Sequence, residues 1–239
     1  MKIAFCFSGY PRFVNQSFRS IKENCLDRLP NYSIYAHFQW SDDWMNQKIH
    51  HEFQNKFSEN ELQMFVEKYT PYNLKTINVV KPYQFDVSCI TPISIESDMN
   101  MTPEVAKDCF YRLKCQYQSI SDCIRSIENL HEYDFVVRMR TDLIFNMPIE
   151  CSMFDKNKVI TQSGFCAGSD REHCDWFIVC PTEKVGFFHE LSNMEEHFKT
   201  GVIHMHKLIK SIGQKYNIDH RQFFVDTPST KNTAKYFTR

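Results

Sequence analysis

The amino-terminal forty residues constrain the fold of this chain more than any other segment. Lys2 to Phe7 is a nearly continuous apolar run, which is typical of a strand buried on both faces of a sheet. Phe13 to Leu29 has apolar residues at roughly helical spacing and ends at Pro30, and Ser33 to Phe38 predicts a second strand. A strand, a helix and a strand in this order favour a parallel sheet with a right-handed crossover. The sequence therefore predicts an α/β fold with a mostly parallel sheet.

The rest of the chain continues the alternation of helices and strands. A capping box is predicted where Ser58 precedes Glu61 at the start of a helix. Residues 81–101 read as a long irregular segment. The tail from Asn217 onward is expected either to contribute an edge strand or to pack over the site. The further helices predicted from apolar periodicity span residues 58–69, 102–129, 182–198 and 201–214, and the further strands span residues 77–80, 135–137, 159–160 and 175–179.

Length and composition narrow the class of protein. A chain of 239 residues suits one domain with a substantial core. Its formal net charge of -1 argues against broad electrostatic attraction to nucleic acid or to an anionic membrane. The sequence has no signal-peptide core and no apolar stretch of membrane-spanning length, and its ten cysteines form no C-x-x-C pair. We therefore expect a soluble, cytoplasmic protein with reduced thiols.

Charged residues follow one of the later predicted strands. Residues 133–145 read Tyr-Asp-Phe-Val-Val-Arg-Met-Arg-Thr-Asp-Leu-Ile-Phe. At the two-residue period of a strand, Arg138, Arg140 and Asp142 would share one face of an extended segment. A sheet interior accepts two guanidiniums and a carboxylate only if they pair or contact a polar ligand. Two interpretations follow, an anion or metal site at a strand end and a self-satisfied Arg–Asp cluster.

A second polar motif, Ser8-Gly9-Tyr10-Pro11-Arg12, follows the first predicted strand. Open α/β sheets bind ligands at the carboxyl ends of their strands. Gly9 allows a close approach of the backbone to a ligand, and Arg12 offers a bidentate fork for phosphate. The motif is neither a P-loop nor a G-x-G-x-x-G fingerprint, so an ordinary strand-to-helix turn is the alternative.

Together these motifs resemble those of nucleotide-sugar-dependent glycosyltransferases of the GT-A fold. The shared pattern is a first strand that leads to Ser-Gly-x-Pro-Arg, a helix with Gln and Ser on one face, and then Tyr-Asp-x-Val-x-Arg-x-Arg-x-Asp-Leu. It is similar in particular to bacterial and large-virus members linked to surface-glycan synthesis. The resemblance implies a GT-A-like, Rossmann-like mixed sheet flanked by helices. Residues 1–130 would form the nucleotide-binding half, and residues 131–239 the metal and acceptor half with a carboxy-terminal tail.

The resemblance also implies how the donor is held. In that fold an Asp-x-Asp motif binds a divalent metal on the diphosphate, and Arg140-Thr141-Asp142 stands at the matching place. Asp142 is therefore carried over as a metal ligand or ribose contact, whereas the guanidinium of Arg140 would itself neutralise a diphosphate. The implied cofactor is Mn²⁺ or Mg²⁺. A late histidine, His204 or His206, would complete the metal site, and an exposed helical histidine is the alternative.

Further donor contacts and an acceptor residue follow from the same resemblance. The implied donor contacts are Ser8, Gly9, Arg12, Gln116 and Arg138. Asp175, which precedes Trp176 and an apolar run, is the implied general base for the acceptor hydroxyl, with Trp176 as a sugar-stacking platform. A surface aspartate beside a core tryptophan is the alternative.

The sequence thus predicts a glycosyltransferase that moves a sugar from a nucleotide-sugar donor to a hydroxyl of a glycan acceptor. Asp175, Asp142 and Arg140 are the expected catalytic residues. Because the first acid of the metal motif is missing, a non-catalytic nucleotide-sugar or glycan-binding module with a degenerate metal site is the alternative. A nucleotidyltransferase is a third interpretation, although no Gly-rich phosphate loop with a lysine supports it.

Overall fold

One sheet of seven strands organises the chain. The computed structural model describes residues 1–40, 60–86, 103–162, 174–195, 205–221 and 225–226. The strands of the large sheet are β1 (Ile3–Gly9), β2 (Tyr32–Gln39), β3 (Leu74–Val80), β4 (Phe135–Met139), β6 (Val159–Gln162), β7 (Cys174–Pro181) and β8 (Ile218–Arg221). Their order across the sheet is β3-β2-β1-β4-β7-β6-β8. A small second sheet pairs β5 (Ile144–Phe145) with β9 (Val225–Asp226).

The large sheet is mixed and mostly parallel, which confirms the predicted fold class. β1 pairs in parallel with both β2 and β4, and the pairs β2–β3 and β6–β8 are also parallel. β7 runs antiparallel to its neighbours β4 and β6. The chain leaves β1 for β2 on one side and later returns to β4 on the other. The strand order therefore reverses between β1 and β4, and open α/β sheets bind ligands outside the carboxyl ends of the strands at such a point.

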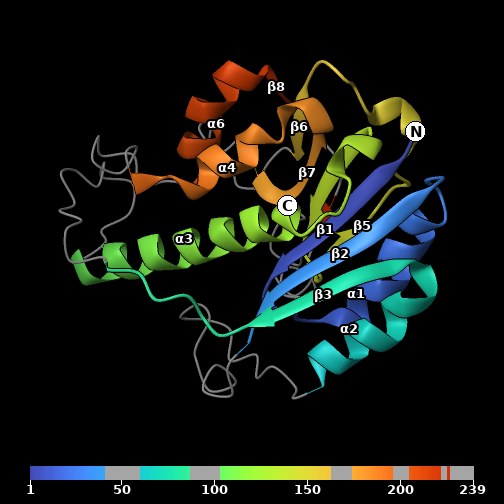
Figure 1. Ribbon diagram of the computed structural model, residues 1–239, viewed down its shortest axis with the longest axis horizontal. Coiled ribbons are helices and arrows are strands. Elements are labelled where there is room, and N and C mark those ends of the chain that lie inside the picture. The colour runs from blue at the N-terminus through green and yellow to red at the C-terminus, as the bar shows by residue number, and fades with distance from the viewer. Residues whose placement is uncertain (41–59, 87–102, 163–173, 196–204, 222–224, 227–239) are drawn as a thin grey trace, which may run out of the picture.

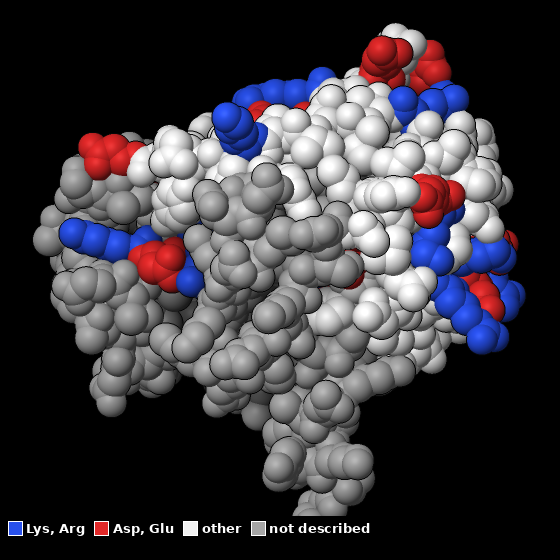
Figure 2. All heavy atoms as spheres, turned by 90° about the horizontal axis from the view of Figure 1, so that it is seen from below, with Lys and Arg blue, Asp and Glu red and all other residues white. Residues whose placement is uncertain are grey.

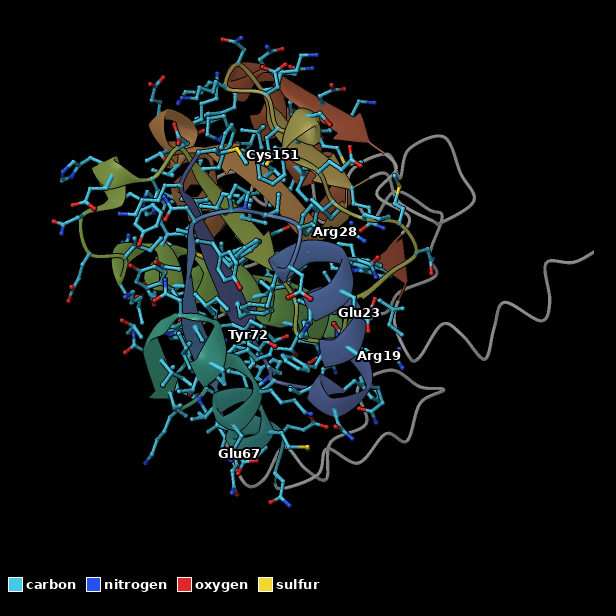
Figure 3. The ribbon with its side chains drawn as sticks, turned by 90° about the vertical axis from the view of Figure 1, so that its right-hand side faces the viewer. Arg19, Glu23, Arg28, Glu67, Tyr72 and Cys151 are labelled. Carbon is cyan, nitrogen blue, oxygen red and sulfur yellow. The ribbon has the colours of Figure 1, made fainter. Side chains whose placement is uncertain are left out.

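Helices cover both faces of this sheet (Figure 1). The helices α3 (Pro103–Arg125), α4 (Gly186–Ser192) and α6 (Met205–Tyr216) pack on one face. The helices α1 (Val14–Ile21) and α2 (Glu61–Tyr69) pack on the other, where Figure 3 shows them next to each other. Alternate strand residues supply the two cores: Phe5 and Phe7 face α1 and α2, whereas Ala4 and Cys6 face α3.

Short helical turns complete the described elements. A π-helical segment, Lys22–Leu26, continues α1. The 3₁₀ turns are Thr70–Tyr72, Leu130–Glu132, Cys151–Met153 and Thr182–Lys184.

The long helix α3 confirms its predicted periodicity but ends earlier than expected. Phe110, Tyr117, Ile120 and Ile124, at three-, four- and seven-residue steps, are all buried against the sheet. The helix was expected to reach residue 129 and ends at Arg125. The backbone N–H groups of residues 126 and 127 bond to carbonyls three residues back, and a serine hydroxyl also donates to the carbonyl of residue 123 at 2.7 Å. The last turn thus tightens and stops the α-helix.

Several other predicted boundaries also shift. The helix predicted over residues 13–29 divides into α1 and the π-helical segment. The helix predicted over residues 182–198 begins as a 3₁₀ turn followed by α4, and its last residues, 196–198, lie outside the described residues. The last helix is described from Met205 to Tyr216 rather than to residue 214. Residues 201–204, where that helix was expected to begin, lie outside the described residues. The strand β8 at one edge of the sheet confirms the edge strand expected from the tail.

The carboxylate of Glu61 has a different role from the predicted one. Ser58, its expected capping-box partner, lies outside the described residues. Glu61 itself is buried and accepts a hydrogen bond of 2.8 Å from the backbone N–H of Val14, the first residue of α1. Burial raises the pKa of Glu61, although the backbone hydrogen bonds oppose that shift. Glu61 was expected to cap its own helix, α2, and instead caps α1.

The surface and the cysteines agree with the composition. Lysine and arginine lie beside aspartate and glutamate on the described surface in Figure 2, as a net charge of -1 predicts. The cysteines at positions 6, 25, 115, 123 and 180 are buried and free, and Cys151 is exposed and free. None of the helices in the described part of the chain is long and apolar enough to cross a membrane.

Candidate functional site

The two polar motifs meet at the carboxyl edge of the sheet, beside the reversal of strand order. Thr141 joins them, because its hydroxyl accepts a hydrogen bond from the backbone N–H of Arg12 and donates one to the carbonyl of Arg12, each at 3.0 Å. The hydroxyl of Ser17 in turn donates to the carbonyl of Thr141. The segments that follow β1 and β4 are therefore fixed to each other, as expected for two adjacent parallel strand ends.

Arg12, Arg140 and Asp142 form what we call the rim cluster. Arg140 binds the carboxylate of Asp142 in a bidentate fork, with 2.8 Å from Nε to Oδ1 and 2.6 Å from Nη2 to Oδ2. Arg12 Nε adds a third contact, 2.8 Å from Oδ2. The Asp142 side chain is 1% exposed, whereas those of Arg12 and Arg140 are 22% and 17% exposed. The carboxylate is thus covered by two guanidiniums that reach the surface.

The ring of Trp176 lies against the rim cluster. The guanidinium carbon of Arg140 is 5.0 Å from the centroid of this ring, which is a cation–π arrangement. The backbone N–H of Arg140 also donates to the carbonyl of Trp176 at 3.3 Å. Trp176, expected to stack on a sugar, is therefore in contact with a guanidinium.

Gln116, Arg138 and Asp175 form a second group, which we call the buried cluster. Both Arg138 and Asp175 have side chains 1% exposed, and Nη2 of the arginine lies 3.8 Å from Oδ2 of the aspartate. Arg138 Nη1 also donates to the main-chain carbonyl of Asp175, and Gln116 Nε2 donates to Asp175 Oδ2. This cluster connects α3, β4 and β7.

The expectation that Arg138, Arg140 and Asp142 share one face of an extended segment is wrong. β4 ends at Met139, and a turn follows at Thr141 and Asp142. Because Thr141 is bonded to the segment after β1, the chain leaves the extended conformation before Asp142. Arg138 remains in the strand and pairs with Asp175, while Arg140 pairs with Asp142.

Three buried polar atoms near these clusters have no hydrogen-bond partner among the described residues. They are Ser8 Oγ, Arg138 Nε and Asp175 Oδ1. Ser8 and Arg138 are on neighbouring strands, and Cys6, two residues before Ser8, is opposite Arg138 in the β1–β4 pairing. A general base needs a carboxylate oxygen within reach of the hydroxyl proton. Among the described residues no donor binds Oδ1 of Asp175, so this oxygen is the one that could accept the proton. The role of Asp175 as base stays a prediction.

Gly9 has the backbone conformation that its predicted role requires. Its φ is +101°, in the region that favours glycine, and no atom lies within 4 Å of the place where a Cβ would stand. The backbone between β1 and Arg12 is therefore open on this side, as a close approach by a ligand needs. Whether Ser8 and Gly9 contact a donor stays a prediction.

A relay of polar side chains lies at the neighbouring end of β2. His37 Nε2 is 2.8 Å from the hydroxyl of Tyr83, which donates to Asp122 Oδ2 at 2.6 Å. Since the tyrosine proton goes to the carboxylate, His37 Nε2 carries a proton and donates it. Burial lowers the pKa of His37, although the charge of Asp122 opposes that shift.

The relay was largely missed from the sequence. Tyr83 and Asp122 are 46 and 85 positions away from His37, and no local sequence pattern connects the three residues. A tyrosine shortly after a predicted strand end and an aspartate on the long helix were the available signals.

The residues around Asp142 do not fit the divalent cation that the family resemblance implies. Mn²⁺ and Mg²⁺ bind several oxygen ligands, but both carboxylate oxygens of Asp142 already accept from arginine. No group of three histidine, cysteine, aspartate or glutamate side chains suited to a metal occurs in the described part of the chain. His204 lies outside the described residues, and His206 is in α6 with a side chain that is not described.

A polar cavity of about 420 Å³ opens at the opposite, amino edge of the sheet. Its lining includes Lys2, Lys75 and Glu128, and no residue of the rim cluster or the buried cluster. The cavity and the two clusters therefore occupy opposite edges of the same sheet.

The chain is similar to known proteins in structure. No family model matches the chain, and no curated protein matches its sequence. Among solved structures, the chain is similar to the apo-form crystal structure of the glycosyltransferase GlyE from Streptococcus pneumoniae TIGR4, with 10% sequence identity and a TM-score of 0.45. The match covers 91% of this chain and 44% of that one, so this chain spans less than half the length of its neighbour. At this identity the likeness concerns the fold alone.

Proposed function

We propose that this protein is a glycosyltransferase that moves a sugar from a nucleotide-sugar donor to a hydroxyl of a glycan. One observation carries the proposal: Arg12 and Arg140, from segments after two different strands, converge on one carboxylate at the carboxyl edge beside the reversal of strand order. Nucleotides bind at this place in open α/β sheets. Guanidinium forks match the geometry of phosphate oxygens.

The rim cluster would supply catalysis by stabilising the leaving group. When the bond between the sugar and the diphosphate breaks, negative charge develops on the diphosphate. Fixed positive groups at that point lower the barrier, because they need no rearrangement during the reaction. Arg12 and Arg140 would provide this charge, and the open backbone at Gly9 would allow the donor to approach closely.

The acceptor would bind on the β7 side of the rim cluster. Trp176 contacts Arg140, and the preceding Asp175 belongs to the buried cluster. In the proposed reaction Oδ1 of Asp175 accepts the proton of the acceptor hydroxyl as the sugar is transferred. Gln116 and Arg138 would position this carboxylate, through the hydrogen bonds that they donate to it and to its main chain. No step passes through a metal ion.

A panel of nucleotide sugars and nucleoside diphosphates tests the proposal, with the melting temperature as the readout. A ligand that binds only the folded protein raises the melting temperature according to its affinity. We expect at least one nucleotide sugar to stabilise the wild-type protein and to be hydrolysed or transferred. The Asp142→Ala variant should keep its fold and lose this activity. Wild-type activity in that variant would refute the role of Asp142, and a panel without any stabilising ligand would refute the proposal.

A non-catalytic nucleotide-sugar-binding module is the second candidate. The observation that favours it is the state of the two carboxylates, since Asp142 and Asp175 are both buried and both bound to arginine. Calorimetric titration of the nucleotide sugars, followed by an assay for released nucleoside diphosphate, distinguishes the two functions. Binding without release in the presence of glycan acceptors favours the module, and release favours the enzyme.

A further inference from the structure

We propose that the rim cluster binds the donor diphosphate without a divalent cation, and that Asp142 is a positioning residue for Arg12 and Arg140. The inference rests on the proposed function and adds that no metal cofactor is needed at this carboxylate. It replaces the expected metal ligand by a pair of guanidiniums.

The first step is the occupancy of Asp142. Its Oδ1 accepts from Arg140 Nε, and its Oδ2 accepts from both Arg140 Nη2 and Arg12 Nε. A carboxylate offers about four lone-pair positions, so three contacts leave little room for a cation. A cation would have to displace arginine from a carboxylate that is 1% exposed.

The second step is charge. Two guanidiniums and one carboxylate leave the rim cluster with one net positive charge. A divalent cation at Asp142 would lie within a few ångströms of both guanidiniums and would be repelled by them. The positive charge that a cation brings to a diphosphate is already present here in the form of arginine.

The second guanidinium distinguishes the rim cluster from a purely structural ion pair. One guanidinium is enough to neutralise one carboxylate, as Arg138 does for Asp175 in the buried cluster. The rim cluster places a second guanidinium on the same carboxylate. A diphosphate would bind across both guanidiniums, because their forks match the geometry of phosphate oxygens.

The third step is the placement of the arginines. Arg140 is held by the bidentate fork and by the ring of Trp176, and the main chain of Arg12 is held by Thr141. Arg12 uses Nε for Asp142, and the guanidinium carries four further N–H bonds on its two Nη atoms. Both side chains reach the surface while the carboxylate beneath them does not. Asp142 thus holds two phosphate-binding forks in a fixed arrangement.

Calorimetric titration with uridine, guanosine, cytidine and adenosine diphosphates tests the inference, first in chelator and then with Mn²⁺ added. For the nucleotide that binds most tightly, we expect the two dissociation constants to agree within about threefold. An increase in affinity of about tenfold or more with Mn²⁺ would overturn the inference and leave the proposed function standing. If none of the four nucleotides binds under either condition, the proposed function itself fails.

A double variant, Arg12→Gln with Arg140→Gln, tests the guanidiniums directly. In chelator it should lose nucleotide affinity by about a hundredfold or more, since each arginine contributes a charge-assisted contact. Arg19→Gln is the matched control, because Arg19 is 85% exposed on α1 and pairs only with the neighbouring Glu23 in the described structure (Figure 3). Its affinity should equal that of the wild type. Wild-type affinity in the folded double variant would overturn the inference.

The substitution Asp142→Asn distinguishes between the two possible roles of Asp142, a positioning residue and a metal ligand. The amide keeps one oxygen acceptor for arginine and removes the charge that a cation needs. We expect nucleotide affinity to fall by the same factor in chelator and in Mn²⁺. A loss seen only with Mn²⁺ would show that Asp142 is a metal ligand and would overturn the inference. Circular dichroism and thermal unfolding verify that the variant is folded.

Discussion

The rim cluster and the buried cluster use the same residue types at neighbouring places along the chain, yet they are built differently. In the buried cluster one guanidinium meets one carboxylate, and both are 1% exposed. In the rim cluster two guanidiniums share one carboxylate and are 22% and 17% exposed. The first arrangement pairs the charges one to one and is buried, and the second brings two guanidiniums to the surface. The two clusters thus differ in the number of guanidiniums on the carboxylate and in exposure.

The largest expected effect comes from breaking the buried cluster. Arg138→Met leaves the carboxylate of Asp175 buried without its guanidinium. Removing one partner of a buried pair costs about 3–5 kcal/mol of unfolding free energy. Denaturant unfolding, monitored by circular dichroism, measures this loss.

A double variant tests whether the loss of stability comes from the unpaired charge in the buried cluster. Arg138→Met combined with Asp175→Leu removes both charges, and such replacements are often nearly neutral for stability. The double variant should therefore be more stable than Arg138→Met alone. A single variant within about 0.5 kcal/mol of wild type would contradict the description of this pair as a buried ion pair.

The rim cluster should respond in the opposite way, with a large effect on binding and a small one on stability. Arg140→Gln removes hydrogen bonds to a charged ligand, each of which contributes about 1.5–3 kcal/mol, so nucleotide affinity should fall by about tenfold to a hundredfold. Because the side chain is partly exposed, the unfolding free energy should change by less than about 1 kcal/mol. Calorimetry and denaturant unfolding of the same sample measure both. A stability loss as large as that of Arg138→Met would remove the distinction between the clusters.

Gly9→Ala tests the backbone beside the rim cluster. The φ of +101° is unfavourable for a residue with a Cβ, and we expect a loss of about 1–2 kcal/mol in unfolding free energy. No described atom would clash with the added methyl group, so the fold should persist. Nucleotide affinity should fall as well if the donor approaches the backbone here. Unchanged affinity in the variant would place the donor elsewhere.

The smallest expected effect is a pH dependence at the end of β2. Burial lowers the pKa of His37 in the folded protein below its unfolded value near 6.5. The unfolded state therefore binds more protons, and the stability from this residue is present above about pH 6.5 and declines as the pH falls toward the folded pKa. His37→Gln should reduce the loss of melting temperature between pH 7.5 and pH 5.5. An unchanged slope in His37→Gln would contradict the buried neutral state of His37.

The sequence was sufficient to predict much of the fold. The apolar runs of β1 and β2, and the helix between them, are local signals that determine a parallel unit. The approach of Arg12 to the segment after β4 agrees with the rule that the carboxyl ends of parallel strands share one edge.

The pairing of the charged side chains was not predictable in the same way. Arg138 meets Asp175 because β7 lies antiparallel beside β4, in a register that pairs Met139 with Phe177. Gln116, which lies on α3 and 59 positions before Asp175, donates a hydrogen bond to the same aspartate. Such contacts depend on how distant elements pack, and no spacing within a short window encodes them.

In the proposed reaction the rim cluster binds the diphosphate of a nucleotide sugar that the protein then cleaves. The most direct measurement is the release of nucleoside diphosphate from a panel of nucleotide sugars by the wild type, by Arg12→Gln combined with Arg140→Gln, and by Arg19→Gln. We expect the wild type and Arg19→Gln to release it from at least one donor at equal rates, and the folded double variant to release essentially none. Equal release by the double variant and the wild type, or no release by the wild type from any donor, would contradict the claim.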